Sequence, residues 1–387
     1  MAQTFDVCIR GAGVVGRTLA LLLARERLRV ALVAATPAPW VPPAEAGSPA
    51  GDDVRAYALN TASRSLLESV RSWPDAAHAT AVRHMEVHGD RSGRVTFDAG
   101  PQQGDALAWI VDVPALESRL ADAVRFQPQV ELVPAPVPAA LTVICEGRAS
   151  RTRDELGVEF DVTPYAQHAI ATRLHCEKPH GEVARQWFLP DGILAFLPLD
   201  GDQGNSVAVV WSVSQERVAE AMALDAEAFA QRLQEASQNA LGALRPIGSR
   251  ASWPLQQARA RRWCGALPVQ PARGAQRTWA LAGDAAHTVH PLAGQGLNLG
   301  LADAESLARM VRTRDYWRGV GDLRVLRQYE RERKAALLPV GLAMDGLQQL
   351  FGRSEGAVQS LRNWGMQGFE FSGPLKDWVA RRAMGTP

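Results

Sequence analysis

The sequence predicts an α/β protein, and three patterns support this fold class. The apolar run from Phe5 to Ile9 leads into the glycine-rich stretch GAGVVG and then into leucines at helical spacing, which indicates a strand, a turn and a helix. Residues 82–111 alternate between polar and apolar types, and residues 163–214 hold several further strand patterns. The chain after Asp303 is mostly helical. We therefore expect a Rossmann-like unit, a second and mainly antiparallel β-sheet, and C-terminal helices.

The composition is that of a globular chain with little net charge. Its 387 residues are 47% hydrophobic, enough for the cores of two or three domains, and the formal net charge is +1. Because basic and acidic residues are balanced, the composition does not predict a binding surface for nucleic acid or for an anionic membrane. The apolar runs break well before the roughly 18 residues of a membrane span, and the first strand leaves no room for a leader. Four scattered cysteines are typical of reduced thiols, so we expect a cytoplasmic protein.

The stretch GAGVVG matches the dinucleotide-binding fingerprint in its proper context, between a strand and a helix. In this motif Gly11 permits a tight turn, Gly13 lets a pyrophosphate approach the backbone, and Gly16 allows the helix to pack closely on the strand. The amides at the helix N-terminus then face the phosphates.

The second strand of such a unit, here Arg29 to Ala34, normally ends in an acidic residue that binds the adenosine ribose. Ala34 stands at that place, and the following Pro- and Ala-rich loop offers only Glu45 as a distant substitute. Losing one charge-assisted hydrogen bond would weaken cofactor binding by about 1.5 to 3 kcal/mol, or roughly 10- to 150-fold.

Residues 278–303, TWALAGDAAHTVHPLAGQGLNLGLAD, form the most unusual stretch of the chain. An apolar strand end is followed by the turn Gly283-Asp284, whose carboxylate could accept hydrogen bonds from a ligand hydroxyl. Small residues then lead into a helix, where bare amides favour an electron-rich group. The alternative is a strand, a tight loop and an ordinary surface helix. His287 and His290 lie three apart, but no nearby cysteine or carboxylate completes a metal site.

The stretch GDAAHTVHPLAGQGLNLGLADA resembles the second flavin-contacting motif of FAD-dependent aromatic hydroxylases with the p-hydroxybenzoate hydroxylase fold. Within that family it is most similar to the hydroxylases of ubiquinone biosynthesis. The resemblance implies that Asp284 holds the FAD ribityl chain, that amides near Gly294 to Asn298 face the flavin pyrimidine oxygen, and that Pro291 lies beside the ring. The expected cofactor-binding residues are Gly11, Gly13, Gly16, Arg55, Gly283, Asp284, Pro291, Gly294, Gln295, Gly296, Leu297 and Asn298.

Two shorter stretches carry the same resemblance. DVRAYALN is similar to the family pattern D-x-R-x-x-A-L-S, which places Arg55 near the flavin; an arginine at a surface helix start is the alternative. EGRASRTR is similar to D-G-x-x-S-x-x-R, with Glu146 in place of aspartate. In relatives this element touches the FAD pyrophosphate region and the nicotinamide nucleotide. Alternatively, Arg148, Arg151 and Arg153 belong only to a solvated charged turn.

The resemblance also implies an interleaved domain order. Residues 1–75, 111–158 and 275–320 would form the FAD-binding part, residues 76–110 and 159–274 the substrate part, and residues 321–387 a helical region. The segment 134–140, PAPVPAA, is predicted to be a tight linker where the family carries a strand hairpin. Leu224 to Leu241 is predicted to be one amphipathic helix. Four aromatic residues are candidates for a wall against an aromatic substrate or, alternatively, for core packing: Trp187, Phe188, Phe196 and Trp211.

The activity that the resemblance implies is hydroxylation of an aromatic ring. NADH or NADPH reduces FAD, the reduced flavin takes up molecular oxygen, and a flavin hydroperoxide transfers a hydroxyl group to the ring. A lipophilic prenylated phenol of ubiquinone biosynthesis is the expected substrate, with at most peripheral membrane contact or a biosynthetic complex as partner. No side chain is assigned as a catalyst. A weakly FAD-binding, non-catalytic subunit and a catabolic or secondary-metabolism hydroxylase are the alternatives.

Overall fold

The computed structural model describes residues 5–34, 53–89, 93–99, 106–190, 192–202, 204–267, 277–289 and 296–351. Within these ranges a parallel sheet of six strands forms the first layer, and only its edge strand β16 runs antiparallel. The strand order is β16 (Cys264–Ala266), β17 (Thr278–Leu281), β9 (Ala139–Ile144), β1 (Phe5–Arg10), β2 (Val30–Val33) and β8 (Val130–Val133). The carboxyl ends of β1, β9 and β17 therefore meet at one edge of the sheet.

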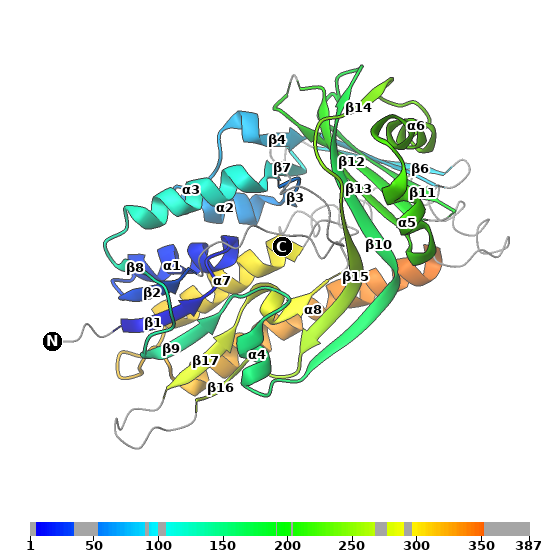
Figure 1. Cartoon of the computed structure of the whole chain (residues 1–387). Helices are drawn as coiled ribbons and strands as arrows, with labels where there is room; N and C mark the ends of the chain where they lie inside the picture. The colour runs from blue at the N-terminus through cyan, green and yellow to red at the C-terminus, as the bar shows by residue number, and fades with distance from the viewer. Residues whose placement is uncertain are drawn as a thin grey trace.

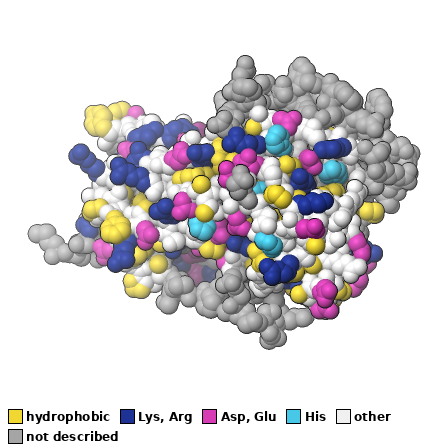
Figure 2. Space-filling view, turned by 90° about the horizontal axis from the view of Figure 1, so that it is seen from above, with side chains coloured by type: hydrophobic (Ala, Val, Ile, Leu, Met, Phe, Trp, Pro, Cys, Tyr) yellow, Lys and Arg dark blue, Asp and Glu magenta, His cyan; other side chains and the backbone are white. Residues whose placement is uncertain are grey.

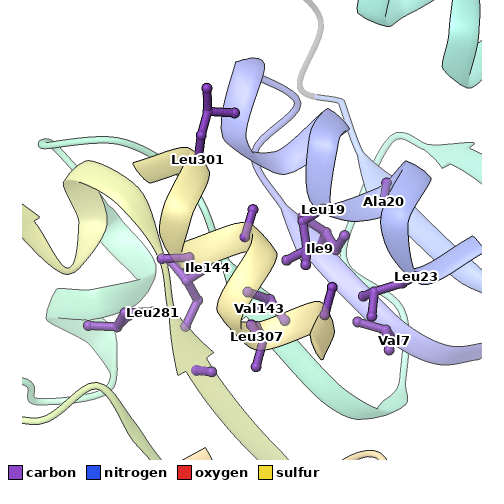
Figure 3. Packing of buried hydrophobic residues seen from close by; sticks show 14 of the residues in the cluster. Val7, Ile9, Leu19, Ala20, Leu23, Val143, Ile144, Leu281, Leu301 and Leu307 are labelled. Carbon is purple, nitrogen blue, oxygen red and sulfur yellow. The ribbon is translucent and has the colours of Figure 1, made fainter. Parts of the chain in front are cut away.

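Helices cover one face of this sheet (Figure 1). They are α1 (Val14–Arg25), α2 (Thr61–Ser69), α3 (Val113–Arg125) and α7 (Gly296–Arg312). Leucines of α1 and α7 interlock with the apolar side chains of β1, β9 and β17, as Figure 3 shows for Leu19, Leu23 and Leu307. The helix α8 (Leu323–Phe351) packs on α7 and beside β16, and the short α4 (Arg151–Glu155) follows β9. Burial of these leucines at about 25 cal/mol per Å² is what holds the layers together.

A second sheet, counted over the same described residues, has nine strands and is mainly antiparallel. Its path is β18 (His287–Thr288), β15 (Ala251–Ala260), β10 (Phe160–Cys176), β13 (Ser206–Ser214), β12 (Gly192–Leu199), β11 (Val183–Leu189), β5 (His84–His88) and β6 (Arg94–Asp98), with β14 (Leu244–Pro246) beside β10. The helices α5 (Gln215–Ala223) and α6 (Ala226–Ala236) cover one of its faces. The predicted single helix from Leu224 to Leu241 is therefore wrong in its extent.

The other face of the large sheet packs on a small antiparallel sheet. That sheet has the order β3 (Ala56–Leu59), β7 (Ala108–Asp112) and β4 (Ala79–Val82), with the one-turn helix η1 (Ala76–His78) before β4. Ile110, Ala184 and Ala208 lie in the apolar contact between the two sheets. The fold class predicted from the sequence is confirmed, while the domain boundaries stay a prediction.

Three of the four predicted wall residues have another role. Trp187, Phe196 and Trp211 are almost fully buried and belong to the apolar core that also contains Phe229 and Leu233 of α6. The register of β11, β12 and β13 places these three side chains on the same face of the sheet, the face that α5 and α6 cover. The prediction of a substrate wall is therefore wrong for them. Phe188, one residue after Trp187 on β11, points to the opposite face.

The connection from β8 to β9 is short, because β9 already begins at Ala139. The predicted linker, residues 134–140, is therefore two residues too long, because its last two residues belong to β9. All four cysteines are unpaired. Among the described helices, none is long and apolar enough to cross a membrane. On the face shown in Figure 2, basic and acidic side chains of the described residues are interspersed, as the nearly neutral composition predicts.

Candidate cofactor site

The turn between β1 and α1 needs two of its three glycines for steric reasons. Gly11 has a φ of +110°, and a Cβ there would lie 2.4 Å from the Cys145 carbonyl oxygen. A Cβ at Gly16 would lie 1.9 Å from the Gly11 carbonyl oxygen, so α1 can start this close to the strand only with glycine. Gly13 is different, since a Cβ there would meet no atom within 4 Å.

Gly13 is also the N-cap of α1, and none of the described side chains caps the helix there. The amides of the first turn thus point into open space beside Gly13, at the positive end of the helix dipole. This arrangement suits a phosphate group, which accepts hydrogen bonds from several amides at once.

The second predicted motif reaches the same place from the other end of the chain. A Cβ at Gly283 would lie 3.3 Å from Val15, and a Cβ at Gly300 in α7 would lie 2.9 Å from the same side chain. Val15 belongs to the first turn of α1. The start of α1, the start of α7 and the turn after β17 therefore converge on one residue.

Asp284 lies in this turn, in the one-turn helix η2 (Gly283–Ala285). Its side chain is open to solvent, yet protein atoms surround it so densely that desolvation raises the pKa of the carboxyl above its ordinary value. A carboxyl group that is both closely surrounded and exposed can meet a ligand, and we call its surroundings, together with Gly13 and Val15, the recess. Tyr57 of β3 faces the same charge, because desolvation and then the Asp284 carboxylate raise the pKa of its phenol.

Asn298 fixes the beginning of α7. Its Oδ1 accepts hydrogen bonds from the Asn60 amide at 3.0 Å and the Ser63 hydroxyl at 2.7 Å, and its Nδ2 donates to the Ala58 carbonyl at 2.8 Å. Both acceptor positions and one of the two donors of the side chain are thus used within the protein, while the backbone of the helix start is left for a ligand. Gly296 and Leu297 open α7 beside it, whereas Pro291, Gly294, Gln295 and His290 lie outside the described residues.

Arg55 is held in a cluster of charges rather than extended into the recess. Its guanidinium makes a two-pronged contact with Asp53, at 2.8 and 2.5 Å, and lies 3.5 Å from Glu117. Burial opposes the charge, but the Asp53 carboxylate outweighs it and raises the pKa of Arg55. Arg173 of β10 donates to the Arg55 carbonyl at 3.3 Å and to Asp112 at 2.8 Å, which links the large sheet to this segment.

Glu146 caps the short helix α4. Its carboxylate accepts hydrogen bonds from the Ser150 hydroxyl at 2.8 Å and the Thr152 hydroxyl at 2.5 Å, and it pairs with Arg10 at 2.9 Å. Burial opposes ionisation, but these donors hold the pKa of Glu146 below its ordinary value. Contact of this element with a nicotinamide nucleotide stays a prediction.

Arg153 is buried rather than solvated. It stacks over Phe160 with 3.6 Å between the guanidinium carbon and the ring centre, and it donates to the Arg148 carbonyl at 3.1 Å. The alternative of a solvated charged turn therefore fails for Arg153.

One buried group was missed by the sequence analysis. Asp303 accepts a hydrogen bond from the Gly283 amide at 2.9 Å and pairs with His287 at 2.7 Å and with Arg333 at 2.7 Å. His287 therefore has a carboxylate partner, and the described residues contain no cluster suited to a metal ion. The only signal in the sequence was an aspartate at an otherwise apolar helix position.

Known proteins of similar sequence indicate the family to which the chain belongs. A family model described as FAD binding domain matches residues 121–338. The 3-demethoxyubiquinol 3-hydroxylase of Escherichia coli K12 is 30% identical, with 99% of each chain covered. The ubiquinone hydroxylase UbiL of Rhodospirillum rubrum is also 30% identical, over 98% of this chain and 90% of that protein.

Among solved structures, p-nitrophenol 4-monooxygenase PnpA from Pseudomonas putida DLL-E4 superimposes with a TM-score of 0.73 at 18% identity, covering 100% of this chain and 99% of that one. The flavin-dependent brominase Bmp2 gives 0.70 at 14% identity, covering 99% and 94%. These two likenesses show the fold. Because the family model spans more than half of the chain, and a relative with 30% identity spans nearly all of it, this chain belongs to the FAD binding domain family.

Proposed function

We propose that this chain is an FAD-dependent monooxygenase that hydroxylates an aromatic ring, namely that of a prenylated phenol intermediate of ubiquinone biosynthesis. The observation that carries the proposal is the convergence on Val15 of two helix starts and the Asp284 turn. Two relatives that span nearly the whole chain bear the names of hydroxylases acting on ubiquinone precursors or ubiquinone.

The residues present fit FAD. Uncapped amides of α1 beside the open Gly13 suit the pyrophosphate, and the accessible carboxylate of Asp284 suits the ribityl hydroxyls. Backbone amides at Gly296, Leu297 and Asn298 suit the electron-rich edge of the flavin ring. We assign the cofactor to these residues and to Gly11, Gly16, Gly283, Pro291, Gly294 and Gln295, while Arg55 would act from its place beside the recess.

Bound FAD, reduced by NADH or NADPH, supplies the oxygen activation that the protein itself lacks. The chain's own residues bind and orient. Asn298 keeps the start of α7 in register with β3, and Arg173 ties the large sheet to the Arg55 segment, so the two parts keep a fixed separation. No side chain is proposed as an acid, base or nucleophile, because the ring substrate is electron-rich and the cofactor would supply the oxygen chemistry.

The test of this proposal is a deletion strain. We expect it to accumulate one prenylated phenol intermediate, measured by mass spectrometry of lipid extracts, and to recover when the gene is supplied on a plasmid. Normal quinone levels in the deletion strain would contradict the assignment to ubiquinone biosynthesis and favour a catabolic or secondary-metabolism ring. A cytoplasmic location and docking on a lipid-carrying biosynthetic complex belong to the same proposal.

A second candidate function rests on Ala34. This residue directly follows β2, where the fold usually supplies the acid that binds ribose, and its amide donates to the Val133 carbonyl at 3.2 Å. A methyl group there offers the adenosine half of FAD no hydrogen bond. Weak binding would suit a non-catalytic subunit of a biosynthetic assembly.

We expect Ala34→Glu to tighten FAD binding roughly 10- to 150-fold, the value of one charge-assisted hydrogen bond. The measurement is titration of the purified protein with FAD, followed by quenching of flavin fluorescence. Ala34→Gln is the matched control, because it adds similar bulk without charge and should give a smaller gain. If the starting protein already binds FAD tightly and Ala34→Glu changes nothing, the argument for a degenerate subunit is lost.

A further inference from the structure

Asp303 is a fully buried carboxylate at the meeting point of four elements. Asp303 lies on α7. Its Oδ2 accepts hydrogen bonds from the Gly283 amide in η2 at 2.9 Å and from His287 of β18 at 2.7 Å. Its Oδ1 accepts from Arg333 of α8 at 2.7 Å. A buried charge is tolerated only when it is paired and hydrogen-bonded, and this carboxylate meets both conditions.

The contact with Gly283 bears directly on the cofactor site. Gly283 has a left-handed φ of +64° and immediately precedes Asp284, so the direction of its amide sets the direction of the next side chain. Burial opposes ionisation of Asp303, but His287 and Arg333 hold its pKa below the ordinary value. The Gly283 amide is thus anchored by a charged acceptor, which is stronger and more directional than a neutral one.

The partners of Asp303 are themselves immobilised. His287 is 3% exposed and stacks on Trp263 with ring centres 5.1 Å apart and planes 18° apart. Arg333 is 7% exposed and also donates to the Leu299 carbonyl at 3.4 Å. Among the described residues, Nδ1 of His287 has no hydrogen-bond partner, a cost that simple packing would avoid with an apolar residue.

We propose that Asp303 is a positioning residue for the cofactor, which orients the Gly283-Asp284 turn, and that Arg333 sets FAD affinity from α8 by holding Asp303 in place. The inference rests on the proposed function, since it assigns FAD to this turn. We therefore expect Arg333, which lies outside the recess, to control cofactor binding through the Asp303 carboxylate.

The experiment compares FAD affinity in variants of the full chain by titration with fluorescence quenching. Arg333→Met removes the charged partner of Asp303 Oδ1 and leaves the buried carboxylate with His287 alone as its ion-pair partner, so it is expected to raise the Kd for FAD at least tenfold. Arg333→Lys keeps a positive charge that can pair with Asp303, so its Kd should stay within about threefold of the starting protein. Asp303→Asn keeps the shape but weakens the acceptor, and is expected to raise the Kd at least fivefold.

Arg309→Met is the matched control. Arg309 pairs with Glu332, so this variant also cuts an ion pair between α7 and α8, but one that is about 40% exposed and does not touch the turn. Its Kd should stay within twofold. Hydrogen exchange of the segment 278–289 in FAD-free protein adds a second readout, with faster exchange expected in Arg333→Met than in Arg309→Met.

A folded Arg333→Met or Asp303→Asn protein with the starting Kd would overturn the inference. Should Arg333→Met fail to fold, the Asp303→Asn protein decides in the same way. If the unsubstituted chain itself binds no FAD, the proposed function fails instead, so the two failures are told apart.

Discussion

The Gly16→Ala protein is expected to lose about 3 kcal/mol or more of its free energy of unfolding. The new methyl carbon would lie 1.9 Å from the Gly11 carbonyl oxygen, which belongs to the backbone and cannot rotate away. Relief requires α1 to move off β1, and this opens the largest apolar core of the protein, where Leu19 and Ile9 are fully buried. Urea or thermal unfolding of the FAD-free protein measures the loss.

Gly13→Ala is the matched comparison within the same motif. Gly13 has a φ of −78°, which any residue adopts, and its methyl group would meet no atom within 4 Å. We expect unchanged stability but at least tenfold weaker FAD binding, because the methyl group would occupy the space beside the α1 amides. Equal effects of both substitutions on stability would refute this division, and full FAD affinity of Gly13→Ala would show that the pyrophosphate lies elsewhere.

Asp284→Asn is expected to weaken FAD binding by about 1.5 to 3 kcal/mol, or roughly 10- to 150-fold. The asparagine keeps the shape of the side chain but removes the charge that strengthens its hydrogen bonds to ribityl hydroxyls. Titration with FAD at neutral pH measures the change. Glu131→Gln, which removes a negative charge from an exposed position on β8, should leave the affinity unchanged.

The same substitution should act in the opposite direction on the protein without FAD. Desolvation raises the pKa of Asp284 in the folded state, so the folded chain binds this proton more tightly than the unfolded chain does. The carboxyl group therefore favours folding most below its unfolded pKa and disfavours it once pH rises above the folded pKa. We expect Asp284→Asn to raise the unfolding temperature at pH 7 but not at pH 3, and an equal gain at both would contradict this account.

Local patterns predicted much of the fold and of the site. The strand and helix around GAGVVG, and the turn at Gly283-Asp284, follow from glycine spacing and apolar runs, since both are properties of neighbouring residues. The strand patterns in residues 163–214 also predicted β11 and β12, but they could not say which face α6 would cover. Trp187 and Phe196 were misplaced for that reason, because the choice of face depends on helices that follow later in the chain.

The network around Asp303 was beyond the reach of such patterns. His287, Asp303 and Arg333 are separated by 16 and 30 residues, and Arg333 reaches Asp303 only through the packing of α8 on α7. The helix α5 was missed for a more local reason, since it starts directly after β13 at Gln215 without an intervening loop signal.

The placement of β9 between β1 and β17 has a consequence for biosynthesis on the ribosome. The first half of the nucleotide site is synthesised about 270 residues before Gly283, and at about 5 to 20 residues per second this interval lasts roughly 13 to 54 s. During that time β1 can pair with β2 and β9, but β9 still lacks its neighbour β17, and α1 lacks α7 beside it. The cofactor site can therefore be completed only after the turn at Gly283 and the start of α7 have been synthesised.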